Sequence, residues 1–214
     1  MSENSHQTSE LIYDPRGVVD VQHTELAARV AELDGLRLGV LSNTKWNAAK
    51  LLRATVRVLE SRGLVLAGVR HYDKEHFSKD AASELIAQIS AESDIALTAI
   101  GDCGSCTSCC VNDAVRLEQA GVPTAVIVTT EFEHEARLQR EARGMAALRP
   151  IVVTHPISSL TLEQLDQRAG EAAPQARAIW TGTELSQQPA EALGRPTLSA
   201  STTSTRQIAG GSVS

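Results

Sequence analysis

Residues 94–120 read DIALTAI-GDCGSCTSCC-VNDAVRLEQA, an apolar run followed by four clustered cysteines and an amphipathic stretch. A short apolar run bounded by turn residues is typical of a buried strand. Gly121 suits the position just past a helix, where a left-handed backbone is common. The stretch therefore predicts a strand over 94–100, a turn, and a helix over 107–120. The cysteines would lie at the strand-to-helix turn, where free backbone N–H groups favour anionic sulfur.

The same alternation extends to both sides of this stretch. Apolar runs predict strands at 38–41, 64–69, 123–129 and 150–154, and helical spacing predicts helices at 48–59, 78–91, 131–143 and 162–173. Residues 42–44 (Ser-Asn-Thr) offer side chains that can cap the first helix. Short apolar strands that alternate with helices indicate an α/β fold with a doubly wound, mostly parallel sheet of about five strands. We expect helices on both faces and a flavodoxin-like or related strand order.

The polarity of the chain predicts three parts. Residues 1–35 are mostly polar and predict an N-terminal arm, with a short helix over 25–33. Residues 36–182 carry the α/β pattern and the thiol site. Residues 183–214 are rich in Ser, Thr and small side chains, and predict a disordered tail because they bury too little apolar surface to order themselves.

Composition excludes several functional classes. The 214 residues carry a net charge of −6, which argues against a nucleic-acid partner. No apolar run approaches the 18–20 residues, roughly, of a membrane span. The polar N-terminus lacks the apolar core of a secretory signal, so we expect a cytoplasmic protein. In a reducing cytoplasm, clustered cysteines indicate redox, nucleophilic or metal chemistry more often than structural disulfides.

Polar and reactive side chains follow four of the predicted strands. In a doubly wound sheet, ligands bind beyond the carboxyl ends of the strands, so we expect these side chains to share one edge. The expected set comprises Asn43, Lys45 and Asn47 after the first strand, Asp102, Cys103, Ser105, Cys106 and Thr107 after the third, Thr130 after the fourth, and His155 after the fifth.

Cys103 is the predicted nucleophile of this set. It is the first cysteine past the strand, and the helix N-terminus and Lys45 are expected to lower its pKa, whereas the adjacent Asp102 is expected to raise it. Cys106 is spaced to act as a resolving thiol, as in C-x-x-C redox motifs. His155 is the predicted proton donor. We assign Asn43, Lys45, Asn47, Ser105, Thr107 and Thr130 to the binding of an anionic substrate.

The remaining two cysteines and the glycine of the turn have simpler expected roles. Cys109 and Cys110 lie inside the predicted helix, where packing is the expected role. Gly104 is expected to permit a tight turn and close backbone approach.

The cysteine spacing does not favour a metal site. A bacterial iron–sulfur run places its fourth cysteine three residues after the third and follows it with proline, whereas Cys110 follows Cys109 directly. A structural zinc site draws on two separated ligand pairs, and no second Cys/His pair is present. We therefore predict no metal or other cofactor, with zinc or iron at the cysteine cluster as the weaker alternative.

The motif over 101–108 (GDCGSCTS) resembles the UGSC family, which is named for a selenocysteine-Gly-Ser-Cys motif in which many members carry cysteine. Residues 113–114, 117–118, 121–124 and 155–156 also fit, as do Asp14-Pro15, 33–35 and the Asn43-x-Lys45-x-Asn47 pattern. The resemblance spans about residues 11–160.

More distantly, this part of the chain is similar to the selenocysteine segment of glycine reductase component B. That resemblance places Cys103 at the selenocysteine position and makes Cys106 its partner thiol. In that enzyme the selenolate reductively cleaves a carbon–nitrogen bond. This chain carries sulfur at that position, which is a weaker nucleophile and leaving group than selenium.

We expect a thiol-dependent enzyme, of reductase or lyase type, that acts on a small anionic molecule. The alternatives are a thiol–disulfide or peroxide oxidoreductase, a non-enzymatic metal-binding module, and a subunit of a larger reductase complex. A thiol reductant or partner protein is an expected partner, and a homo-oligomer is compatible with the sequence.

Overall fold

The structure is a computed structural model that describes residues 21–184. Its centre is one parallel sheet of five strands in the order β2-β1-β3-β4-β5. The strands are β1 (Arg37–Ser42), β2 (Gly68–Asp73), β3 (Ile95–Gly101), β4 (Thr124–Thr129) and β5 (Ile151–Val153). This order is that of the flavodoxin-like fold, so the predicted α/β class and strand order are confirmed.

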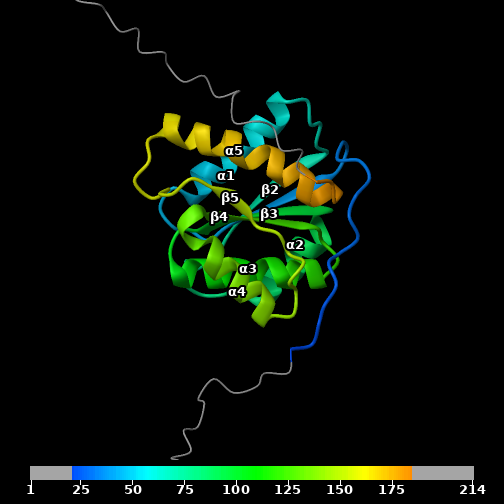
Figure 1. Cartoon of the computed structure of the whole chain (residues 1–214). Coiled ribbons are helices and arrows are strands. Elements are labelled where there is room, and N and C mark those ends of the chain that lie inside the picture. The colour runs from blue at the N-terminus through cyan, green and yellow to red at the C-terminus, as the bar shows by residue number, and fades with distance from the viewer. Residues whose placement is uncertain (1–20, 185–214) are drawn as a thin grey trace, which may run out of the picture. The chain divides into compact units, whose positions relative to one another are not determined.

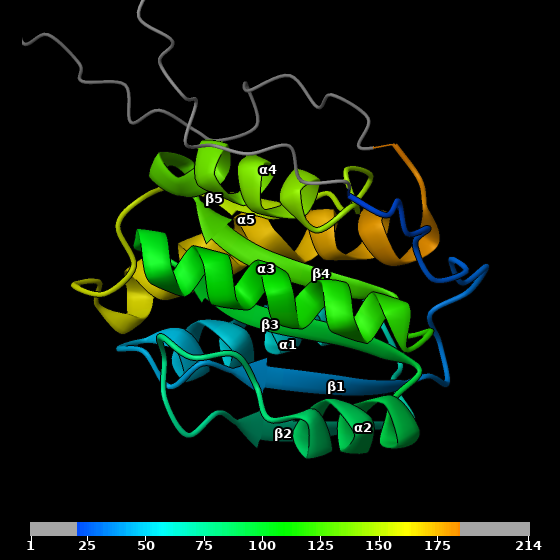
Figure 2. The same cartoon turned by 90° about the horizontal axis from the view of Figure 1, so that it is seen from below.

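Helices cover both faces of the sheet (Figures 1 and 2). On one face lie α1 (Ala48–Ser61) and α5 (Leu162–Thr181), which pack against each other and against β3 and β4. On the other face lie α2 (Ser83–Glu92), α3 (Gly104–Gln119) and α4 (Glu133–Ala142), with the short 3-10 helix η1 (Thr130–Phe132) leading into α4. The three central strands β1, β3 and β4 are almost wholly buried, which explains their unbroken apolar sequence.

The second strand lies further along the chain than its apolar residues suggest. The sequence predicts a strand over 64–69, whereas β2 covers Gly68–Asp73 and is mostly exposed, with Tyr72 as its buried residue. β2 is an edge strand with one neighbour, so polar residues such as Arg70 are tolerated on it. Leu64 is instead a core residue of the loop that precedes the strand. This shift places Lys74 directly after β2.

The last helix runs past the proline at which the sequence predicts its end. α5 continues through Pro174 to Thr181, eight residues beyond the predicted 162–173. A proline ring normally clashes with the carbonyl four positions earlier, which here belongs to Gly170. The final turn is stabilised by Trp180, which is fully buried and donates its indole N–H to the Ala96 carbonyl at 2.9 Å. Tertiary packing therefore outweighs the local penalty of the proline.

The described part of the N-terminal arm is extended, so the helix predicted over 25–33 is wrong. Its backbone bonds to the helices that surround the sheet: Thr24 donates to Gly144 O at 2.9 Å and Val30 to Trp180 O at 3.0 Å. Glu118, buried in α3, accepts the N–H of Ala27 and the guanidinium of Arg29. These long-range contacts give the segment hydrogen-bond partners without a helix.

Residues 1–20 of the predicted arm and residues 185–214 of the predicted tail lie outside the described residues. Within residues 21–184, none of the helices is long and apolar enough to cross a membrane.

Candidate functional site

The candidate site lies at the carboxyl edge of the sheet, where the loops after the parallel strands meet. The loop after β1 carries Lys45, the turn after β3 carries Asp102 and Cys103, and the loop after β5 carries His155. Because β1, β3, β4 and β5 are parallel and successive in the sheet, these loops leave the same edge.

Cys103 is the N-cap residue of α3. Its backbone is extended, with φ −165° and ψ 166°, and its Sγ accepts the N–H of Cys106 at 3.4 Å. The Ser105 hydroxyl lies 3.7 Å from the same sulfur. The helix begins at Gly104, three residues earlier than predicted, because the thiol of Cys103 serves as the cap. The sulfur therefore lies at the positive end of the α3 dipole, where an anion is stabilised.

The four cysteines differ in their ionisation. Partial burial acts to raise the pKa of Cys103, but hydrogen bonds from the Cys106 thiol and N–H and from Ser105, with the Lys45 ammonium, outweigh it and lower the pKa below the ordinary thiol value. Burial, followed by the hydrogen bond to Cys103, raises the pKa of Cys106 to about 12. Burial also raises the pKa of Cys109 and of Cys110. Cys103 is thus the thiol that ionises first, and only a thiolate attacks well.

Close packing at the foot of α3 depends on Gly101, the last residue of β3. A Cβ on Gly101 would lie 2.7 Å from Thr107 Oγ1 and 2.8 Å from Val128 Cγ1. A Cβ on Gly104 would meet nothing within 4 Å, and the backbone of Gly104 does not have positive φ. The close approach expected at Gly104 is therefore made by Gly101, which lets α3 start directly against the sheet.

Three of the predicted substrate-binding residues are buried and bonded to other parts of the chain. Asn43 donates its amide to Ile100 O at 3.0 Å and to Cys110 Sγ at 3.4 Å. Asn47 donates to the carbonyls of Ile157, Ser158 and Leu160 at 3.0–3.3 Å. Thr107 donates to Cys103 O at 2.8 Å. These contacts hold the loop after β1, the loop after β5 and the cap of α3 in place.

The other three predicted substrate-binding residues leave part of their surface open. Lys45 is half-buried beside Cys103, and Ser105 and Thr130 are exposed. Thr130 accepts the backbone N–H of His155 at 3.3 Å. The helix-capping role predicted for residues 42–44 is replaced by a turn: Ser42 Oγ accepts the N–H of Thr44, and α1 begins only after Asn47.

His155 lies beside a buried carboxylate and is hydrogen-bonded to a buried threonine. Its Nδ1 lies 3.0 Å from Asp102 Oδ1 and 3.0 Å from the Thr129 hydroxyl, although Asp102 Oδ1 lacks the alignment of a hydrogen bond. Asp102 Oδ2 accepts the N–H and the hydroxyl of Ser158, at 3.2 and 2.7 Å. The ring of Phe132 lies 5.9 Å from the imidazole. Asp102 therefore links the turn that bears Cys103 to the loop that bears His155.

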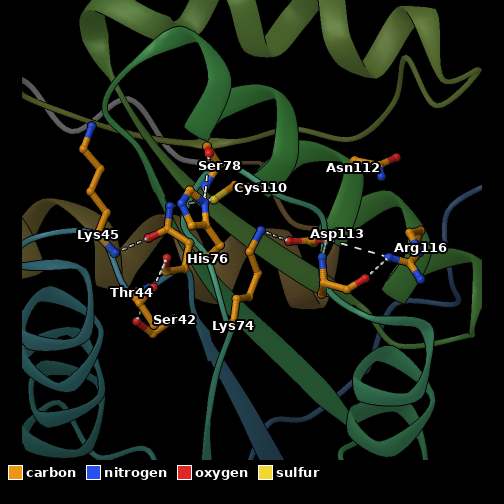
Figure 3. A network of polar contacts seen from close by, with 12 residues as sticks. Ser42, Thr44, Lys45, Lys74, His76, Ser78, Cys110, Asn112, Asp113 and Arg116 are labelled. Atoms are coloured by element: carbon orange, nitrogen blue, oxygen red, sulfur yellow. Dashed lines mark hydrogen bonds and ion pairs between the residues drawn. The ribbon is translucent and has the colours of Figure 1, made fainter.

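A buried ion pair at the same edge was not found from the sequence. Lys74 Nζ donates to Asp113 Oδ2 at 2.6 Å, and both side chains are inaccessible to solvent. Asp113 Oδ1 accepts the N–H of Ala81 at 2.8 Å, so the pair ties the loop after β2 to α3 (Figure 3). Burial raises the pKa of Asp113 despite the opposing effect of Lys74. The signal was present in the sequence, since Asp113 lies three residues after Cys110 on the buried side of α3.

The described surface has a groove on either side of the cysteine turn. One, of about 480 Å³, lies between the loop after β2 and α2 and includes Lys74, His76 and Asp80. The other, of about 360 Å³, follows α4 from Thr130 to Arg140. Cys103 itself lines neither of them. Among the described residues, no three His, Cys, Asp or Glu side chains are grouped so that they could hold a metal ion.

Comparison with known proteins identifies one family. The sequence profile of the UGSC family matches residues 11–182. No curated protein matches the chain.

The similar solved structures are distant. A diflavin flavoprotein A3 from Nostoc sp. is 11% identical, with a TM-score of 0.37 over 68% of this chain and 96% of that chain. A flavodoxin-like domain from Synechococcus sp. is 13% identical, with a TM-score of 0.34 over 65% and 96%. A ribose 5-phosphate isomerase from Thermotoga maritima is 14% identical, with a TM-score of 0.33 over 72% and 91%.

Proposed function

The chain belongs to the UGSC family, and from this membership and the geometry of the cysteine turn we propose that it is a thiol-dependent enzyme. The proposed reaction is redox or nucleophilic chemistry on a small anionic organic molecule, with Cys103 as the attacking thiolate. The observation that carries the proposal is that Cys103 caps α3 and has a lowered pKa, whereas the pKa of each of its three neighbours is raised.

In the first proposed step, Cys103 attacks an electrophilic carbon of a substrate R–X. The sulfur–carbon bond forms while the bond from carbon to X breaks, and X leaves with the electron pair. His155 supplies the proton that X takes up, and its position is favoured by the Asp102 carboxylate 3.0 Å from Nδ1. Lys45, which stabilises the Cys103 thiolate, also attracts an anionic substrate toward the sulfur.

In the second proposed step, Cys106 displaces R from the Cys103 sulfur. R leaves with the electron pair and takes a proton, and a Cys103–Cys106 disulfide remains. The sum is R–X and two thiols giving R–H, H–X and one disulfide, and an external thiol reductant then restores both cysteines. Alkylation of Cys103 removes its negative charge, which is one of the causes that raise the pKa of Cys106. The first step therefore makes Cys106 easier to ionise for the second.

A second candidate function is favoured by the closeness of the two cysteines. The backbone N–H of Cys106 donates to the Cys103 sulfur at 3.4 Å, and both cysteines are free thiols. A peroxide would oxidise the Cys103 thiolate to a sulfenic acid, and Cys106 would condense with it to a disulfide with loss of water. The chain would then be a thiol–disulfide or peroxide oxidoreductase in a reducing cytoplasm.

Site-resolved labelling tests the proposed nucleophile. The full chain is treated with less than one equivalent of iodoacetamide at neutral pH, and the modified cysteine is identified by peptide mapping. The proposal expects the label on Cys103, with Cys106, Cys109 and Cys110 unmodified. Equal labelling of several cysteines contradicts it. Mild peroxide followed by the same mapping tests the second candidate, which requires a Cys103–Cys106 disulfide that the Cys106→Ser variant cannot form.

A further inference from the structure

The groove along α4 is lined by basic side chains, and one of them, Arg140, has a guanidinium that is only partly hydrogen-bonded within residues 21–184. It has a volume of about 360 Å³. Its lining consists of Thr130, Glu133, His134, Arg137, Arg140 and Pro150. Two arginines and a histidine on one face of one helix are unusual for a chain with a net charge of −6. We propose that this groove is a binding site for the oxyanion group, carboxylate or phosphate, of a small molecule.

Arg140 provides the fixed donor of the site. Its Nη1 donates to the Leu148 carbonyl at 2.7 Å, which holds the guanidinium in place. Its Nε is buried and, among residues 21–184, has no hydrogen-bond partner. No carboxylate in the described part of the chain forms an ion pair with this guanidinium. Its Nη2 forms no hydrogen bond with any residue of 21–184 and is not buried, so this nitrogen is left to donate to an oxyanion in the groove.

Arg137 provides a second, adjustable donor. Its Nη1 pairs with Glu141 at 3.2 Å, but both side chains are more than 40% exposed. Such an exposed pair is weak, so Arg137 can turn toward a ligand at little loss. Its Nη2 lies 3.2 Å from His134 Nδ1, which places the imidazole beside the same anion.

The acidic side chains of the groove restrict the kind of anion. Glu133 lines the groove near Thr130, and Glu141 lies beside Arg137 on the same helix. These carboxylates repel a long polyanion such as nucleic acid. Among the side chains that line the groove, Arg137 and Arg140 outweigh Glu133 by one positive charge, which suits a single carboxylate or phosphate group.

The groove also reaches the candidate active site. Thr130 lies at one end and accepts the backbone N–H of His155. Along α4, the seven steps from Glu133 to Arg140 give a rise of about 10 Å. A molecule of about this length with an anionic end at Arg140 would bring its other end to the loop of His155. The link between the groove and the active site rests on the proposed function, whereas the binding of an oxyanion at Arg140 does not.

Calorimetric titration of the full chain at low ionic strength tests the site. The probes are inorganic phosphate and succinate, with chloride as the reference anion, and the probe that binds more tightly tells which oxyanion the groove prefers. We expect saturable one-to-one binding of at least one probe, weakened at least tenfold in Arg140→Gln. Arg57→Gln, which removes an exposed arginine on α1, is the matched control and should bind as the unmodified chain does.

Arg137→Gln is the second variant, for use if Arg140→Gln does not fold, and it should weaken binding in the same direction. Absence of saturable binding, or unchanged affinity in both arginine variants, overturns the proposal. Cys103→Ser should bind the probe normally. The oxyanion site can thus be confirmed even if the thiol chemistry is disproved, and overturned even if that chemistry is confirmed.

Discussion

The carboxylate of Asp102 lies 3.0 Å from Nδ1 of His155, and this contact joins the turn after β3 to the loop after β5. Asp102 is also bonded to Ser158, so the carboxylate is fixed from two sides of that loop. Because Nδ1 faces Asp102, Nε2 is the nitrogen left to meet a substrate. His155, the proposed proton donor, therefore lies beside Asp102, the residue that directly precedes Cys103.

Asp102→Ala should lower the stability of the fold. The substitution leaves the partly buried N–H and hydroxyl of Ser158 without their acceptor, which lowers the free energy of unfolding by about 1–3 kcal/mol. Urea denaturation measures the change. Asp166→Ala is the control, since its exposed pair with Arg57 contributes at most about 1 kcal/mol. Equal stability of the two variants would show that Asp102 does not hold the loop.

Gly101→Ala should displace the cap of α3. The new Cβ would lie 2.7 Å from Thr107 Oγ1, so α3 must move, at a loss of about 1–3 kcal/mol of stability. We also expect slower alkylation of Cys103, because its position at the helix N-terminus changes. Gly104→Ala is the control: its Cβ meets nothing within 4 Å, and alanine favours a helix by up to about 1 kcal/mol over glycine. Similar losses in both variants would rule out close packing at Gly101.

Lys74→Met should be among the most destabilising single changes near the site. It leaves the buried Asp113 carboxylate without its closest cation, with only Arg116 Nη1 at 3.9 Å, and so lowers the free energy of unfolding by as much as about 3–5 kcal/mol. Replacement of both partners, Lys74→Met with Asp113→Leu, should restore much of the loss because no buried charge remains. Lys79→Met, an exposed lysine of the same loop, is the control. Denaturation curves in which Lys74→Met matches Lys79→Met would refute the role of the pair.

Lys45→Gln should reduce the preference of Cys103 for anionic reagents. Lys45 lowers the pKa of Cys103, so its loss slows the alkylation of Cys103 by both iodoacetate and iodoacetamide. Only the negatively charged iodoacetate also loses the attraction of the Lys45 ammonium. The rate with iodoacetate divided by the rate with iodoacetamide should therefore fall by about fivefold, the equivalent of a charge contact of about 1 kcal/mol in water. Lys50→Gln is the control. A ratio that is the same in both variants would remove Lys45 from substrate recognition.

The central strands could be predicted because burial on both faces requires unbroken apolar sequence. β3, β4 and the turn at Cys103 are where the sequence places them, to within one to three residues. β2 could not be located in the same way, since this edge strand is mostly polar and exposed, whereas the apolar Leu64 is a core residue of the loop before it. The error in β2 hid Lys74, which therefore did not enter the predicted site.

Contacts between distant parts of the chain account for the other differences. The segment after residue 20 has helical spacing, but its hydrogen bonds go to Gly144, Trp180 and Glu118, which no local pattern reveals. Residue type also did not distinguish a buried amide from an exposed one. Asn43 and Asn47 are suited to bind a ligand by chemistry, yet their amides are bonded to the loops of the chain itself.

The pH dependence of Cys103 alkylation tests the central claim most directly. A lowered pKa means that Cys103 is ionised at a lower pH than an ordinary thiol, whose pKa is 9.0. Site-resolved iodoacetamide rates, measured between pH 5 and 10 by peptide mapping, should therefore reach half their maximum for Cys103 below that value. Cys106, whose pKa is raised to about 12, should stay almost unreactive over the same range. A Cys103 midpoint at or above the ordinary value, or Cys106 as the faster thiol, would contradict the account.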